Sequence, residues 1–155
     1  MPATLTKDEI HAYLDSKPGW IILTTIGRDG MPHTIPIGYF LERSGNPAAP
    51  AEGRSGDEIY IGCRTGTQKL KNIERNPNVS LLVQSGGSMQ DIKGVMIQGL
   101  ATIITEPAEF LRLSREAAKW RGTPEAQWPT EARPGAAYIR VEPKKYISWD
   151  YARQA

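Results

Sequence analysis

The residues most suited to chemistry lie in one short stretch of the chain. Two cations and two hydroxyls flank a glycine there, in the order Arg64, Thr65, Gly66, Thr67 and Lys69. The neighbouring residues predict a strand over 59–63 and a helix over 68–75, for which Thr67 can act as the cap. A lysine in the first turn of a helix is unfavourable beside the positive end of the helix dipole, unless an anion lies close by. Together with the free N–H groups of the helix start, these side chains indicate a phosphate site.

The same pattern allows a second interpretation, in which a surface helix begins with a lysine that points into water. An anion site needs several donors that converge on one point, and convergence is not visible in a sequence. The stretch is not a P-loop, because Lys69 follows Gly66 by three residues and is itself followed by Leu70. On pattern alone, the phosphate site and the solvated helix start therefore both stay open.

A hairpin precedes this stretch. Residues 20–26 predict a strand, an Asp-Gly pair marks the turn, and residues 31–41 return as a second strand. Pro32 and Pro36 lie inside the second strand, and each removes a ladder donor. The strand should therefore be an edge, or should leave part of its backbone facing a flat ligand. His33, between the prolines, would face that ligand or the solvent.

The remaining periodicity predicts a mainly β protein. Further helices are expected from Thr6 to before Pro18, and from the Thr105-Glu106-Pro107 cap onward. Further strands are expected over 78–83, 94–105, 136–141 and 145–150, with a bulge or close backbone approach at Gly99. Six or seven mostly antiparallel strands with few helices favour a closed barrel with helical inserts, in one domain over 1–155.

Two loops are rich in proline and glycine. Residues 42–56 contain no apolar anchor and are interpreted as a flexible hairpin tip. Residues 122–135 carry Trp128, which would either fill a subunit interface or form a wall of a substrate pocket.

Composition narrows the function classes. The 155 residues are 39% hydrophobic and 23% charged, which suits one globular domain with a real core. A net charge of +2 is too small to indicate a nucleic-acid partner. Cys63 is the single cysteine, so neither an intramolecular disulfide nor a cysteine zinc site is available, and no metal site is predicted. No apolar run approaches about 20 residues and no signal-peptide core is present, so we expect a cytoplasmic protein without a membrane partner.

At this point several motifs match a known family. The stretch Gly66-Thr67-Gln68-Lys69, followed by Asn72 to Leu81 (NIERNPNVSL), resembles the signature of the pyridoxamine 5′-phosphate oxidase-like split β-barrel flavoproteins. That signature places a small hydroxyl residue and a lysine at the phosphate, then a short helix, then an N/D-P-x-V-S strand. Weaker matches are Gly30 to His33 with Pro36, Gly99 to Ala101, and Tyr146 to Trp149. The resemblance covers about residues 20–149.

The resemblance implies an FMN-binding split barrel that forms a homodimer, with two flavin sites at the subunit interface. The FMN phosphate would be held by Arg64, Thr65, Thr67 and Lys69. The ring edge would meet the backbone of His33, Thr34, Ile35, Pro36 and Ile37. Cys63 and Gln68 would be further cofactor contacts, and Lys93 and Trp149 would approach from the partner subunit.

The chain departs from the pyridoxal phosphate-forming oxidases at its C-terminal end. Those enzymes carry an arginine and histidine pair there that grips the substrate, whereas this chain has no histidine after His33. We therefore expect an FMN-dependent oxidoreductase acting on some other small molecule, with no catalytic residue of its own because the flavin does the redox chemistry. The alternatives are an F420-dependent reductase of the same fold, and a non-catalytic carrier or sensor of flavin or haem.

Overall fold

The structure is a computed structural model that describes residues 1–42 and 58–154. Its helices are α1 (Lys7–Asp15), α2 (Gln68–Arg75), α3 (Pro107–Trp120) and the 3₁₀ turn η1 (Glu125–Gln127). Its strands are β1 (Pro2–Ala3), β2 (Ile21–Ile26), β3 (Pro32–Ile37), β4 (Phe40–Glu42), β5 (Glu58–Arg64), β6 (Asn78–Ser85), β7 (Lys93–Ile104) and β8 (Ala136–Gln154). Within these residues, no helix combines the length and the apolar character that a membrane span needs.

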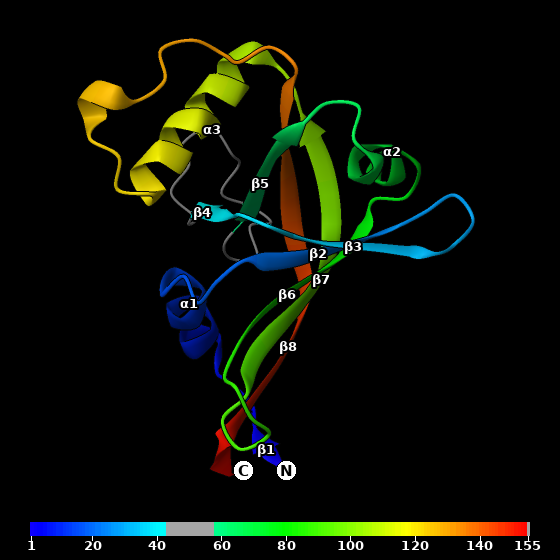
Figure 1. Cartoon of the computed structure of the whole chain (residues 1–155), viewed down its shortest axis with the longest axis vertical. Helices are drawn as coiled ribbons and strands as arrows, with labels where there is room; N and C mark the ends of the chain where they lie inside the picture. Colours follow the sequence, from blue (N-terminus) through cyan, green and yellow to red (C-terminus); the bar gives the residue numbers. More distant parts are fainter. Residues whose placement is uncertain (43–57, 155) are drawn as a thin grey trace.

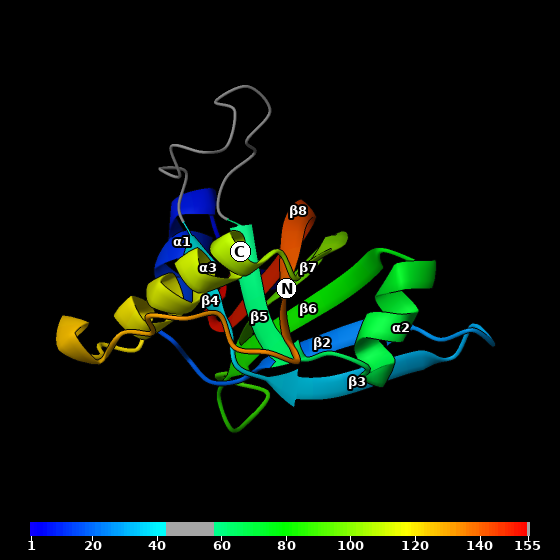
Figure 2. The same ribbon diagram turned by 90° about the horizontal axis from the view of Figure 1, so that it is seen from above.

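All strands pair in antiparallel fashion in one sheet of order β3-β2-β6-β7-β8-β5-β4, with β1 paired to the end of β8. The two ends of this order, β3 and β4, are separated in the chain only by Gly38 and Tyr39. The sheet therefore curls until its ends meet (Figures 1 and 2). No ladder joins β3 to β4 among the described residues. The expected mainly β split barrel is confirmed, but covalent connection rather than hydrogen bonding closes it at this point.

Alternating side chains build the core inside the curved sheet. Ile21 and Leu23 of β2 are fully buried, as are Val95 and Ile97 of β7, while the residues between them are more exposed. Such period-two burial is the pattern of a sheet with one face in the core. Helix α1 packs Ile10, Tyr13 and Leu14 against this core, and the predicted capping box at its start is present.

Four sequence-based boundaries are wrong, each for a local reason. The strand expected over 31–41 is divided into β3 and β4 by the Gly38-Tyr39 corner. The two strands expected after residue 135 are one strand, β8, which bends where Lys144 is left unpaired. Helix α3 is capped by the carboxylate of Glu106 rather than by Thr105. Glu42 belongs to β4 and forms an ion pair with Arg112, while the rest of the predicted 42–56 loop lies outside the described residues.

Gly99 satisfies both expectations made for it. The register of β7 against β8 shifts between Gln98 and Gly99, which is the predicted bulge. A Cβ at Gly99 would lie 2.5 Å from the Glu142 carbonyl oxygen, so the two backbones also approach closely. This bulge bends the long β7–β8 pair and so separates the end of β8 near α2 from the end near the chain termini (Figure 1).

Candidate functional site

The junction between β5 and α2 presents unused backbone donors. The Thr65 N–H donates to the Gly135 carbonyl at 3.1 Å, which fixes the end of β5 against the start of β8. Gly66 then adopts a left-handed φ of 76°, which favours glycine, and Thr67 is the N-cap of α2. The Thr67 hydroxyl donates to the Arg64 carbonyl at 3.1 Å instead of capping the helix. The first three N–H groups of α2 therefore have no acceptor from the helix or its cap.

Two cations gather at the same junction. Burial raises the pKa of the Cys63 thiol, and the positive charge of Lys69 opposes that rise, so Lys69 lies near the end of β5. Arg64 is exposed at the last position of β5. Neither cation forms an ion pair with a carboxylate among the described residues. Two unneutralised cations, hydroxyls and free N–H groups make a site suited to a phosphate. We call Cys63 to Lys69 the β5–α2 cluster.

Asn72 anchors α2 to the sheet. Its side chain is fully buried and donates to the hydroxyl of Thr25 on β2 at 3.0 Å. Its carbonyl oxygen accepts from Gln68 at 2.8 Å and from Arg75 at 2.9 Å. One buried amide thus sets the position of the helix whose start carries the β5–α2 cluster. It also turns the Gln68 side chain along α2, toward the sheet.

Replacing Asn72 with alanine is expected to destabilise the protein by about 2–3 kcal/mol, because the buried Thr25 hydroxyl loses its partner and a small cavity forms. The free energy of unfolding in urea measures this effect. Gln90→Ala is the matched control, because it removes an exposed amide side chain and should change the free energy by less than about 0.5 kcal/mol. Equal unfolding midpoints for the two variants would show that the Asn72 network contributes nothing.

Strand β3 is an edge strand, as its prolines predicted, and its free side has an unusual donor pattern. The Gly27 N–H donates to the Met31 carbonyl, and bonded pairs alternate along an antiparallel ladder. The backbone groups of residues 32, 34 and 36 therefore point away from β2. Because Pro32 and Pro36 have no N–H, this stretch of the free edge offers one N–H, that of Thr34, among its carbonyl groups. A flat ligand with polar edge atoms could use these groups.

His33 and Gln68 meet at one cavity. The cavity has a volume of about 430 Å³ and lies between the β2–β3 turn and the start of α2. His33 Nδ1 is buried and has no hydrogen-bond partner among the described residues. A buried polar atom without a partner is costly, so a ligand or a second chain that supplies a hydrogen bond there would be favoured. Ile35 and Ile37 follow His33 on the same face and pack on the core, while Thr34 and Pro36 are exposed.

Lys93 and Trp149 lie elsewhere in the chain. Lys93 pairs with Asp150 at 3.8 Å and lies 5.1 Å from the centre of the Tyr13 ring. The Trp149 indole packs on Gly94, where an added Cβ would lie 2.6 Å from the ring. Both are at the end of the β7–β8 pair far from α2 (Figure 1). They do not join the β5–α2 cluster of their own chain, and their predicted contribution from a partner subunit stays a prediction.

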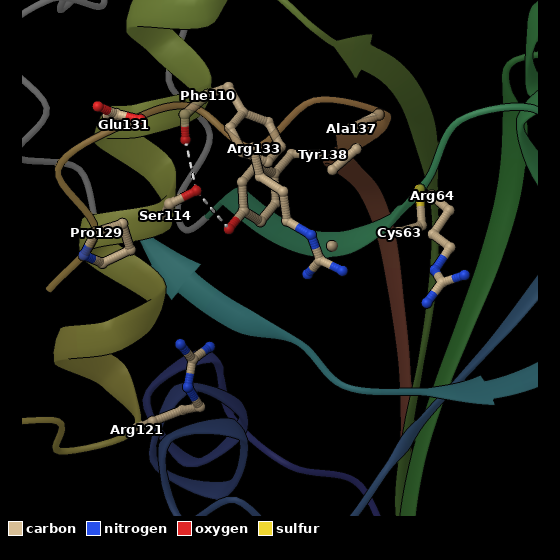
Figure 3. A pocket seen from close by; sticks show the side chains of 12 residues that line it. Cys63, Arg64, Phe110, Ser114, Arg121, Pro129, Glu131, Arg133, Ala137 and Tyr138 are labelled. Atoms are coloured by element: carbon tan, nitrogen blue, oxygen red, sulfur yellow. Dashed lines mark hydrogen bonds between the residues drawn. The ribbon is translucent and has the colours of Figure 1, made fainter. Parts of the chain in front are cut away.

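A cleft that sequence reasoning missed adjoins the β5–α2 cluster. We call it the α3 cleft: a cavity of about 430 Å³ between α3, the loop 122–135, and the strands β5 and β8 (Figure 3). Its lining includes Cys63, Arg64, Phe110, Arg121, Arg133 and Tyr138. The sequence held only a weak signal for this cleft, namely Arg121 and Arg133 near the two ends of the proline-rich loop 122–135.

Trp128 holds the loop 122–135 from within the chain. Its indole N–H donates to the Thr123 carbonyl at 2.7 Å, and the Arg115 guanidinium lies 5.3 Å from the ring centre. Arg115 also donates to the Pro129 carbonyl at 3.1 Å. Trp128 itself is not part of the lining of the α3 cleft, and the pocket-wall hypothesis for a pocket at the flavin stays a prediction. The interface hypothesis stays a prediction.

Comparison with known families gives a decisive match. The family model described as pyridoxamine 5′-phosphate oxidase matches residues 6–150, nearly the whole chain. The chain belongs to this family. The range matched to the pyridoxamine 5′-phosphate oxidase family includes both the β5–α2 cluster and the β3 edge. Among curated proteins, none matches this chain significantly.

Solved structures show the same fold. The conserved hypothetical protein Rv2991 from Mycobacterium tuberculosis is 25% identical, with a TM-score of 0.73 over 95% of this chain and 86% of that one. An F420 reductase is 19% identical, with a TM-score of 0.57 over 84% and 90% of the two chains. HutZ, described as a heme storage protein from Vibrio cholerae, is 12% identical, with a TM-score of 0.63 over 95% and 98%. Members with this architecture thus include proteins named for different cofactors.

Proposed function

We propose that the protein is an FMN-dependent oxidoreductase that acts on a small molecule as a homodimer. The observation that supports this most is the β5–α2 cluster, where Arg64 and Lys69 lack carboxylate partners beside the free N–H groups of α2. Membership of the pyridoxamine 5′-phosphate oxidase family makes a flavin phosphate the natural anion for that cluster.

The residues present suit both the phosphate end and the ring end of FMN. Arg64, Lys69 and the Thr65 hydroxyl would hold the phosphate. The Thr67 hydroxyl would join them by turning its O–H from the Arg64 carbonyl to the phosphate. The free edge of β3 would meet the ring, with the Thr34 N–H as donor and the neighbouring carbonyls as acceptors, and the buried His33 Nδ1 would gain a partner. Bound FMN would supply the redox chemistry. The chain itself would bind the group, orient its ring along β3 and keep water from the buried side.

A homodimer would complete this site. The outward face of the sheet carries a row of half-buried apolar residues that the ladders place side by side: Ile22, Leu82, Met96 and Ile147. A second copy packed on this face would bury the row and bring Lys93 and Trp149 of the partner subunit toward the β5–α2 cluster. The packing of Trp149 on Gly94 and the ion pair of Lys93 with Asp150 would hold both side chains in place for that contact.

The two alternative cofactors have specific support. F420 also carries a phosphate, so the same cluster could hold it, and an F420 reductase shares the fold. Haem is supported by the fold of HutZ and by the buried, unpartnered nitrogen of His33, which could serve as a ligand. A true pyridoxamine 5′-phosphate oxidase is not proposed, because this sequence holds no histidine after His33 that could form the arginine and histidine pair of those enzymes.

The absorbance spectrum of the purified protein, with mass spectrometry of the ligand released on denaturation, tests the proposal. We expect a yellow protein that bleaches with dithionite and releases a compound with the mass of FMN. A Soret band would favour the haem carrier, and release of a deazaflavin would favour the F420 reductase. A colourless protein that binds no added FMN at micromolar concentration would contradict the proposal.

A further inference from the structure

The α3 cleft extends beyond the cavity beside the β5–α2 cluster. A second cavity of about 620 Å³ adjoins it, and the two share Gly62, Arg121 and Tyr138 in their linings. Gly62 is exposed on β5, and a Cβ there would lie 3.2 Å from the Tyr138 ring. A side chain at this position would crowd the Tyr138 ring where the two linings meet. Because the two cavities share these three residues, we call them together the trough under α3.

The walls of the trough are aromatic, and their hydroxyls already have partners. In the first cavity, the rings of Phe110 and Tyr138 lie 4.8 Å apart. The Tyr138 hydroxyl donates to Ser114, which in turn donates to the Phe110 carbonyl (Figure 3). In the second cavity, Tyr39 and Trp120 lie 6.0 Å apart.

Tyr39 is likewise engaged. Its hydroxyl donates to the Leu14 carbonyl at 2.7 Å, and burial raises its pKa to about 12. These walls thus offer flat apolar surface rather than acids or bases, as in pockets for planar organic ligands.

Besides Arg64, two further arginines supply most of the positive charge in the trough. Arg121 follows the last turn of α3, and Arg133 belongs to the loop 122–135. The two arginines thus line the cleft from different elements (Figure 3). Both residues are exposed and neither forms an ion pair among the described residues. Lys17 is already engaged, because its ammonium donates to the Trp120 carbonyl and lies 4.6 Å from the centre of that ring.

We infer that the α3 cleft binds a flat aromatic monocarboxylate, with the carboxylate held by Arg121 and Arg133. The lining carries three arginines, Arg64, Arg121 and Arg133, and one carboxylate, that of Glu131. With Arg64 assigned to the cofactor phosphate, two positive charges stand against one negative, which suits a monoanion better than a phosphate dianion. Cys63 and Arg64 belong both to this lining and to the β5–α2 cluster, so the ligand would lie beside the cofactor. The inference depends on the proposed function only in assigning Arg64 to the cofactor phosphate.

Binding of three related probes to the protein as purified tests this inference. The probes are 1-naphthoate, the neutral 1-naphthamide and the dianionic 1-naphthyl phosphate, each titrated by fluorescence. We expect the parent protein to bind 1-naphthoate at least about tenfold more tightly than 1-naphthamide, because only the carboxylate can pair with the arginines. We also expect Arg121→Gln and Arg133→Gln each to weaken 1-naphthoate binding by about fivefold to tenfold, while 1-naphthamide binding changes by less than about twofold.

Lys119→Gln is the matched control, because it removes an exposed cation of α3 that does not line the cleft, and it should change no affinity. Equal binding of 1-naphthoate and 1-naphthamide, or equal loss of both in the arginine variants, would overturn the inference. Tighter binding of 1-naphthyl phosphate would overturn the choice of a monocarboxylate. FMN titration of the same variants separates the two proposals, because affinity for FMN should stay within about twofold. A parent that binds no FMN yet prefers 1-naphthoate would contradict the proposed function alone.

Discussion

Lys69→Ala is expected to raise the dissociation constant for FMN by roughly 10-fold to 100-fold. Lys69 has no carboxylate partner among the described residues, and it lies in the first turn of α2, where free N–H groups already favour an anion. A hydrogen bond to a charged group contributes about 1.5–3 kcal/mol, which corresponds to that range of affinity. The fold should persist, because alanine is a better helix former than lysine and Lys69 is not one of the buried residues of α2.

Fluorescence titration of the flavin-free protein with FMN measures this change. Lys71→Ala is the matched control, since Lys71 is an exposed lysine of the same helix, and residues two apart on a helix face different directions. It should alter the dissociation constant by no more than about twofold to threefold. Unchanged FMN affinity in a well-folded Lys69 variant would end the assignment of the phosphate to this cluster.

The largest change in assembly is expected from Leu82→Glu. Leu82 lies between Ile22 and Met96 in the apolar row on the outward face of the sheet. In a two-fold dimer each substitution occurs twice, and a buried carboxylate without a partner costs several kcal/mol. We therefore expect the dissociation constant of the dimer to rise by more than about 100-fold. FMN should be lost as well, because the partner subunit would no longer complete the site.

Sedimentation at micromolar concentration, with the flavin absorbance recorded in the same run, measures both effects. Ala108→Glu introduces the same charge at an exposed position of α3 and should leave the dimer intact. A parent protein that sediments as a monomer would contradict the proposed homodimer. A Leu82 variant that remains a flavin-bearing dimer would show that the subunits associate through another face.

The β5–α2 cluster could be predicted from the sequence because its residues are neighbours in the chain. Arg64 to Lys69 span a strand end, a glycine turn and a helix start, and each of these is set by local backbone preferences. The edge position of β3 was also predictable, because proline lacks the N–H that an inner strand must donate. The continuity of β8 was not, because Glu142-Pro143 resembles a break until the bulge opposite Gly99 accommodates it.

The sequence by itself therefore determined the fold class, the edge strand and the contiguous β5–α2 cluster, since these depend on hydrogen bonds and steric limits within a few residues. Only the tertiary structure revealed the α3 cleft. It brings Gly62 of β5 together with Arg121 at the end of α3 and Arg133 of the loop that follows α3. It also decided the turn of the Gln68 side chain toward Asn72 and the placement of Trp149 on Gly94. The physical reason is that long-range strand pairing and core packing set these contacts, and neither depends on the spacing of residues along the chain.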